Sequence, residues 1–204
     1  MFNGGSMKRS ILLFALTLSS VGSLMAQKSG WTLDKAHSSI GFSVRHMVIS
    51  EVTGNFKDFD IAFTSVKDDY SDATVEATIK VASINTDNER RDGHLKTDDF
   101  FNAEKFPQIK FKSTSFEKVG ENKYKITGDL TIRDVTKKVT FDATYNGMIK
   151  APWGATVISW KATSAVNRFD YGLKWNKAIE SGGLIAGDIV TITLNLELNK
   201  PSAS

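Results

Sequence analysis

Cysteine is absent from this sequence of 204 residues, and histidine is scarce. Without a thiolate there is no thiol catalysis, no iron–sulfur centre and no cysteine-based zinc site. The three histidines are His37, His46 and His94, and no HxH or HExxH pair occurs among them. His37 and His46 are nine positions apart, so one regular strand would point them to opposite faces. We therefore expect no bound metal, no cofactor and no catalytic centre.

Long runs of one charge and long apolar runs are also missing. Lys8 and Arg9 precede an apolar run over residues 11–18, which is too short to span a bilayer, and small residues follow at 23–26. This is the pattern of a signal peptide over residues 1–26, which leaves one domain over 27–204. Without residues 1–26, 24 basic and 23 acidic residues remain, so the formal charge falls from +3 to +1. Nucleic acid is therefore not an expected partner.

From Trp31 onward, apolar and polar residues alternate, which is the period of half-buried strands. About eight such strands occur, and short turns join most of them. One strand is expected over residues 52–64, with a bend or bulge at Gly54. The fold class is therefore all-β, with an antiparallel sheet closed into an eight-stranded barrel. A barrel of this size is either filled by its side chains or holds one small ligand.

The stretch 88–107 interrupts the alternation. Residues 85–88 supply capping side chains, residues 89–95 fit a short polar helix, and Pro107 ends the excursion. In an all-strand protein, a helix followed by a loop containing Phe100 and Phe101 is expected to cover one open end. Arg91 and His94 have two interpretations. Either they meet the polar group of a ligand at the entrance, or Arg91 and Asp92 pair with each other or with loop backbone and hold the helix in place.

Five segments resemble the YceI-like family of periplasmic polyisoprenoid-binding proteins: WTLDKAHSSIGFSVRHM, RRDGHLKTDDFFNAEKFPQIKF, GDLTIRDVTKKVTF, NRFDYGL and GDIVTITLNLEL. The sequence departs from the family where Asp134 stands, since the family often has glycine there. The resemblance implies a lipocalin-like barrel around an elongated apolar tunnel. It also implies a long amphiphile as ligand (a polyisoprenoid, an isoprenoid quinone or a fatty amide) and a periplasmic location.

The expected ligand-binding residues lie on the apolar strand faces and at the polar entrance. They are Phe42, Val44, His46, Phe56, Ile79, Arg91, His94, Phe101, Phe111, Leu130, Phe141, Trp160 and Phe169. His46 is either a contact for a ligand head group or a hydrogen-bonded core residue. The aromatic residues are bulky enough to fill the barrel, yet lipid pockets are lined by such groups. The alternation of residues along a strand shows which side chains face inward, but it does not distinguish a filled barrel from a lined pocket.

Three functions remain possible at this stage. The favoured one is a non-catalytic carrier for a long isoprenoid or fatty amphiphile. Such a carrier would make transient contact with the inner or outer membrane, and it could form a homodimer. The second is a hydrolase or another enzyme acting on a lipid-like substrate through Asp34, His37, Arg91 or His94. The third is a structural or stress-related barrel with a filled core. A continuous internal void would exclude the third.

Overall fold

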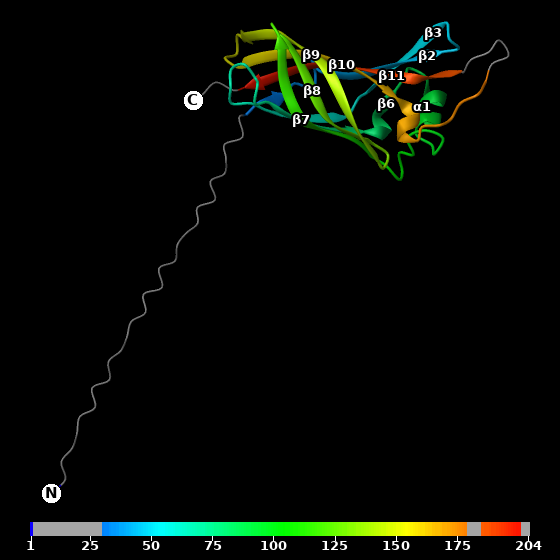
Figure 1. The fold of residues 1–204 in the computed structure, drawn as a ribbon, viewed down its shortest axis with the longest axis horizontal. Coiled ribbons are helices and arrows are strands. Elements are labelled where there is room, and N and C mark those ends of the chain that lie inside the picture. The colour runs from blue at the N-terminus through cyan, green and yellow to red at the C-terminus, as the bar shows by residue number, and fades with distance from the viewer. Residues whose placement is uncertain (2–29, 179–184, 201–204) are drawn as a thin grey trace.

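In a computed structural model of the chain, the described residues are 1, 30–178 and 185–200. Apart from Met1, the predicted signal peptide lies outside the described residues. The described chain is mostly β-strand (Figure 1). Its elements are β1 (Thr32–Leu33), β2 (Ser39–His46), β3 (Ser50–Phe56), β4 (Phe59–Thr64), β5 (Thr74–Lys80), η1 (Val81–Ser83), β6 (Ile84–Asn85), α1 (Glu89–Leu95), β7 (Gln108–Gly120), β8 (Lys123–Ile132), β9 (Val135–Lys150), β10 (Thr156–Asn167), η2 (Arg168–Tyr171) and β11 (Ala186–Lys200).

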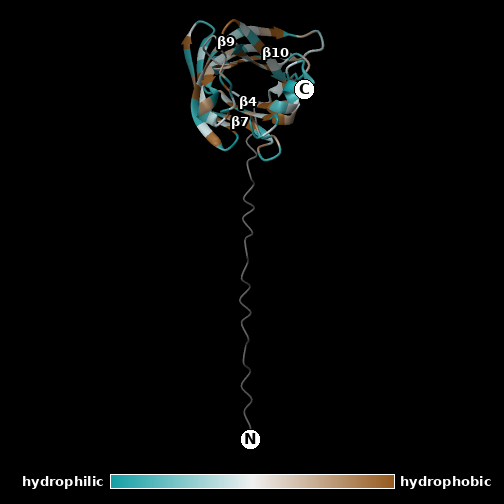
Figure 2. Ribbon diagram, turned by 90° about the vertical axis from the view of Figure 1, so that its right-hand side faces the viewer, coloured by the Kyte–Doolittle hydropathy of each residue, from teal (hydrophilic) through white to brown (hydrophobic). Residues whose placement is uncertain are grey.

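The strands form one antiparallel sheet that curls around a single interior. Its order is β4-β5-β7-β8-β9-β10-β11-β2-β3-β6, and β1 pairs with β11 outside this path. The two edges of the sheet approach each other, because β3 leads into β4 through Lys57 and Asp58. Across this junction the Lys57 amide donates to Ser83 O (3.1 Å) and the Lys80 amide donates to Asp58 O (2.9 Å). Viewed end-on, the ribbon runs around a central space (Figure 2). The predicted all-β lipocalin-like barrel is confirmed.

The expected strand number is wrong in detail, because the sheet of the described chain has eleven strands instead of eight. The stretch 52–64 breaks at Lys57 and Asp58 into β3 and β4. Gly54 is neither a bend nor a bulge, since β2 and β3 pair without a register shift. A Cβ at Gly54 would lie 2.4 Å from the Phe42 ring. The glycine therefore makes room for an aromatic ring from the neighbouring strand.

The predicted helix is α1, at the right-hand end of Figure 1. Asn88 caps it, because its side-chain oxygen accepts a 2.9 Å hydrogen bond from the Arg91 amide. The following turns place Phe100 in the core and Phe101 half-buried, with the Phe101 ring 6.1 Å from that of Phe56. The helix and its loop thus lie across one end of the barrel, as the sequence predicts.

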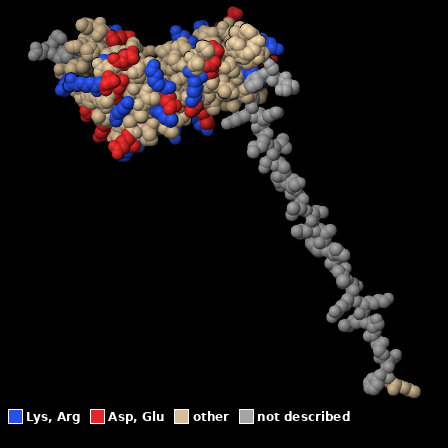
Figure 3. All heavy atoms as spheres, turned by 180° about the vertical axis from the view of Figure 1, so that it is seen from behind, with Lys and Arg blue, Asp and Glu red and all other residues tan. Residues whose placement is uncertain are grey.

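The alternating pattern sorts the side chains between interior and solvent. Phe59, Ile61 and Phe63 of β4 are buried, while Asp60 and Ala62 between them are exposed. On the outer surface, lysines and arginines are interspersed with acidic residues on the face seen in Figure 3. None of the helices in the described chain has the length and apolar character needed to cross a membrane.

Candidate ligand-binding site

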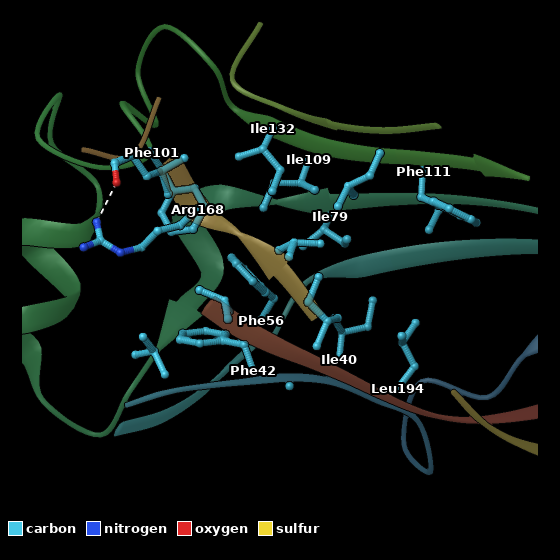
Figure 4. A pocket seen from close by; sticks show the side chains of 18 of the residues that line it. Ile40, Phe42, Phe56, Ile79, Phe101, Ile109, Phe111, Ile132, Arg168 and Leu194 are labelled. Atoms are coloured by element: carbon cyan, nitrogen blue, oxygen red, sulfur yellow. Dashed lines mark hydrogen bonds between the residues drawn. The ribbon is translucent and has the colours of Figure 1, made fainter. Parts of the chain in front are cut away.

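The interior of the barrel contains a cavity of about 610 Å³. Its wall is almost entirely apolar and is built from the inward face of nearly every long strand. Side chains from β2 (Ile40, Phe42), β5 (Ile79), β7 (Ile109, Phe111) and β11 (Leu194) converge on it in Figure 4. The void contradicts the alternative of a barrel with a filled core.

The cavity explains why several apolar strand residues are only half-buried. Val190, Ile192, Leu194 and Leu196 occupy alternate positions in the middle of β11, and none of them is fully buried. All four line the void. Part of their surface is therefore left free on the cavity side, whereas a filled core would cover them completely.

One end of the cavity is closed by aromatic rings. Seven side chains form this aromatic cluster: Trp31, Phe63, Tyr70, Phe116, Tyr124, Tyr145 and Trp160. Trp160 is central to it, with ring centroids 5.0 Å from Tyr124, 5.0 Å from Tyr145 and 5.2 Å from Tyr70. Phe63, Phe116 and Trp160 line the void, and the other four rings lie behind them. Tightly packed rings exclude both water and ligand from this end.

The opposite end is open and polar. The only fully exposed residues among those described around the cavity are Arg45, Asn88 and Arg90. With His46, Arg91, His94 and Arg168 they surround the entrance, which we call the mouth. β2 supplies Arg45 and His46. The helix α1 supplies Arg90, Arg91 and His94. The polar groups of the lining thus gather at one end of an apolar hollow.

Arg91 anchors α1 to the sheet. Its Nε donates to Thr86 Oγ1 (2.8 Å) and its Nη2 donates to Thr86 O (2.7 Å). Thr86 is buried, and its amide and hydroxyl donate to Asp92 Oδ1 at 2.9 and 2.5 Å. The interpretation that Arg91 and Asp92 hold the helix through local bonds is therefore confirmed. Arg91 still lines the cavity, so this role does not remove it from the mouth.

His94 is fixed between an acid and two rings. Its Nε2 lies 2.8 Å from Asp99 Oδ2, and its ring packs edge-on against Phe100 and Trp175, each with centroids 5.1 Å away. Its side chain is 38% exposed, so one edge remains open to the mouth. His46 lies at the mouth end of the same inward row as Phe42 and Val44.

Arg168 is a functional candidate that the sequence-based set omits. It is only 5% exposed, and it begins η2, shown in orange beside α1 in Figure 1. Its guanidinium donates to four backbone oxygens: Leu173 O (2.5 Å), Gly187 O (2.7 Å), Trp175 O (2.9 Å) and Ala186 O (3.1 Å). Burial lowers the pKa of Arg168, although a guanidinium keeps its proton in proteins. The alternation of side chains along β10 predicts that Arg168 faces inward, because Arg168 continues the inward row of Trp160, Ala162 and Val166.

Twelve of the thirteen expected residues line the cavity, and Phe169 does not. Phe169 follows the inward-facing Arg168, and the chain turns there into η2. The Phe169 ring instead packs under the Arg168 guanidinium, 4.4 Å from its centre. Including Phe169 was therefore an error of register. The cavity lining leaves open which of the other twelve contact a ligand, so that role stays a prediction.

The four residues considered for catalysis do not gather. Arg91 and His94 line the cavity, whereas Asp34 and His37 do not. Asp34 Oδ1 instead accepts hydrogen bonds from the amides of Ala36 (2.9 Å) and His37 (3.2 Å), so it organises the turn before β2. The Asp34 carboxylate raises the pKa of His37, and the hydrogen bond from His37 lowers the pKa of Asp34. Glu197 lies beside Asp34 and His37, and one carboxylate or imidazole atom from each of the three lies within 4.8 Å of the other two. Sequence spacing could not reveal this grouping.

Comparison with known proteins identifies the family. The model of the YceI-like domain matches residues 31–198. The chain belongs to the YceI-like family. UPF0312 protein SA2479 of Staphylococcus aureus (strain N315) is 41% identical over 172 residues, which is 84% of this chain and 98% of that relative. The Campylobacter jejuni YCEI protein is 34% identical in its crystal structure, with a TM-score of 0.67 over 85% of this chain and 99% of the other.

A more distant structure shares the fold. A polyisoprenoid binding domain from Saccharophagus degradans has a TM-score of 0.61 at 14% identity, covering 85% of this chain and 99% of that domain. Family membership and the cavity together support a binding protein. The YceI-like barrel described above is therefore common to sequences that share few residues.

Proposed function

We propose that this protein is a non-catalytic carrier for a long-chain isoprenoid or fatty amphiphile, held with its tail in the cavity. A polyisoprenoid, an isoprenoid quinone and a fatty amide all have the required shape. The observation that carries the proposal is the apolar cavity of the barrel, whose polar side chains among the described residues lie at one end. An amphiphile has the same division between tail and head group, so it fits the cavity in one orientation. The tail points to the aromatic cluster, and the head group stays at the mouth.

The size and lining of the cavity support this choice of ligand. Its volume of about 610 Å³ lies within the range of small-molecule pockets, which is roughly 300–1,000 Å³. The binding of a polyisoprenoid by the Saccharophagus degradans domain, as its name states, agrees with the proposed ligand class. Burial of each methylene contributes about 0.8 kcal/mol, so the affinity should rise about fourfold per methylene until the tail reaches the aromatic cluster.

Exchange of such a ligand requires contact with a membrane, and the mouth offers a suitable surface. The hairpin between β2 and β3 ends in Met47, Val48 and Ile49, which are 39%, 51% and 90% exposed. Exposed apolar side chains next to the mouth would enter the interfacial layer of an inner or outer membrane while the ligand passes. The predicted signal peptide supports export, and the family resemblance supports a proposed periplasmic location between these membranes.

Two experiments test the carrier function. Mass spectrometry of an organic extract of the purified protein should detect a long-chain amphiphile. In the second, Leu194→Trp fills part of the cavity, and we expect it to lower the affinity for farnesol by about tenfold or more without loss of stability. Thr191→Trp is the matched control, because Thr191 is exposed on the same strand and lies outside the lining.

Failure has a clear form. A protein that carries no lipid, gains no thermal stability from any prenyl or fatty amphiphile and responds equally to both tryptophan substitutions is not a carrier. Whether the protein forms a homodimer is a separate question, which light scattering of the purified protein answers.

A further inference from the structure

A second pocket lies behind the aromatic cluster, at the end of the barrel opposite α1. We call it the outer pocket: its wall includes the rings of Trp31, Tyr70 and Tyr145 and the side chains of Lys150 and Lys200, and its volume is about 540 Å³. No residue of the described chain lines both this pocket and the cavity. It belongs to the left-hand end of Figure 1, where β11 (red) ends. The aromatic cluster thus separates two spaces with different walls.

Two lysines of the outer pocket flank a hydroxyl group in one cross-strand row. In the register of the sheet, Thr156 of β10 pairs with Lys150 of β9 on one side and with Lys200 of β11 on the other. All three side chains line the outer pocket, so they lie on the same face of the sheet. Neighbouring strands are about 4.8 Å apart, so the two lysines start about 10 Å from each other and can reach one group above Thr156. Lys67, between β4 and β5, adds a third amine to the wall.

These lysine charges are not balanced by acids at the outer pocket. Among the described residues, none of the three forms an ion pair, and the lining contains a single acid, Asp68. Lys200 Nζ lies 5.7 Å from the centre of the Trp31 ring, a contact that leaves its charge in place. Two amines on one face repel each other. A phosphate or carboxylate between Lys150 and Lys200 would remove this repulsion and would accept hydrogen bonds from both.

The rest of the wall suits a hydroxylated ring. The Tyr145 hydroxyl accepts a 3.4 Å hydrogen bond from the Tyr70 hydroxyl, and it keeps its own proton to donate. Asp68 offers carboxylate oxygens to hydroxyl donors, and the half-buried Trp31 presents a flat apolar ring. A sugar has hydroxyl groups around its edge and C–H groups on its faces, which matches this wall. A bare phosphate ion would fill only a small part of the pocket.

We infer that the outer pocket binds an anionic carbohydrate, which is a sugar that carries a phosphate or a carboxylate. Lys150, Thr156 and Lys200 bind the anionic group. The sugar ring lies against Trp31, and its hydroxyl groups bond Tyr145. This site goes beyond the carrier function, because it shares no described residue with the cavity and needs no lipid in it.

Glucose 6-phosphate, glucose and inorganic phosphate make a direct test, because together they separate the sugar from the anion. In calorimetry at low salt, we expect glucose 6-phosphate to bind at least about tenfold more tightly than either of the other two. High salt should weaken its binding, because Lys67, Lys150 and Lys200 are exposed to screening ions. Glucuronate, with a carboxylate in place of the phosphate, should bind more tightly than glucose.

Paired substitutions locate the site. Lys150→Gln with Lys200→Gln should lower the affinity for glucose 6-phosphate by about tenfold or more. Lys110→Gln with Lys161→Gln removes the same charge from exposed positions outside both linings, and should leave the affinity unchanged. Leu194→Trp, which narrows the cavity, should leave it unchanged as well. Circular dichroism checks the fold, and the single variant Lys150→Glu gives the same answer if the double variant is unstable.

Every outcome decides for or against the outer pocket. Inorganic phosphate that binds as tightly as glucose 6-phosphate would mean an adventitious anion site and overturn the carbohydrate. Glucose that binds as tightly would remove the role of the lysines, and equal losses in both lysine pairs would assign binding to overall charge. A loss in Leu194→Trp would move the binding into the cavity. If none of these probes binds, the inference falls, whereas the carrier function, which farnesol tests, is unaffected.

Discussion

The two ends of the barrel differ in the side chains that surround the cavity. At the closed end, seven aromatic rings pack on one another, with Trp160 4% exposed at their centre. At the mouth, four arginines and two histidines surround an opening over which α1 lies. The closed end gains its stability from ring packing, whereas the mouth depends on hydrogen bonds to backbone oxygens.

This difference gives the cavity a direction. A hollow with two apolar ends would accept a tail from either side, whereas the proposed function would have a tail enter this one only through the polar end. Of the bulky residues named in the sequence analysis, Trp160 lies in the closed end, while Phe42, Phe56, Phe111 and Phe141 line the wall of the void without filling it. Substitutions at the two ends should therefore have separable effects on stability and on ligand exchange.

The largest effect is expected at the closed end. Trp160→Ala removes the ring that contacts Phe63, Tyr70, Phe116, Tyr124 and Tyr145, and should lower the free energy of unfolding by about 3–5 kcal/mol. Urea denaturation measures it. Trp153→Ala is the control: Trp153 is 75% exposed, so a change within about 0.5 kcal/mol is expected. Equal losses would show that the aromatic cluster has no special role.

A smaller loss of stability is expected at the mouth. Arg168→Lys keeps the charge but cannot reach four carbonyl oxygens from Leu173 to Gly187, so it should cost about 2 kcal/mol. Arg90→Lys makes the same chemical change at an exposed position, and its free energy of unfolding should match that of the parent protein. The same urea titration compares them. A stable Arg168→Lys variant would mean that these bonds do not hold the mouth together.

Substitutions in the hairpin at the mouth should change the rate of ligand exchange more than they change the free energy of unfolding. Replacing Met47, Val48 and Ile49 by serine should slow transfer of a fluorescent fatty probe from protein to lipid vesicles by about tenfold. The control replaces Met148 and Ile149, which are 60% and 65% exposed in β9, by serine. Stopped-flow fluorescence gives both rates. A slower rate in the control alone would place membrane contact away from the mouth.

The smallest effect concerns the turn before β2, outside the cavity. The pKa of His37 is raised above 6.5 by Asp34, so this contribution to stability is present below about pH 6.5 and is lost as the pH rises through the folded pKa. The pKa of Asp34 is lowered, so its contribution is present above about pH 3.8 and is lost in acid. NMR titration of the His37 ring should show its pKa returning toward 6.5 in Asp34→Asn. An unchanged titration would contradict the pairing.

Much of the fold was predictable because strand parity is a local property. The alternation along β11 assigns Leu194 to the interior and Thr191 to solvent, and the capping role of Asn88 follows from its position before α1. Phe169 was assigned against parity, because the inward row of β10 continues through Val166 to Arg168 and so leaves Phe169 outside the lining. The expected bulge at Gly54 was wrong for a different reason, because the glycine is required by a ring from the neighbouring strand, which the local sequence does not reveal.

The sequence by itself determined the all-β class, the helix at residues 89–95 and the inward rows that line the barrel, because each depends on neighbours in the chain. Whether those rows meet or leave a void depends on how far the curled sheet holds them apart, which is a long-range property. The tertiary structure alone decided that the seven rings of the aromatic cluster close one end and that Arg45, Arg91 and Arg168, far apart in sequence, share one mouth. Barrel closure, which no single segment specifies, brings them together.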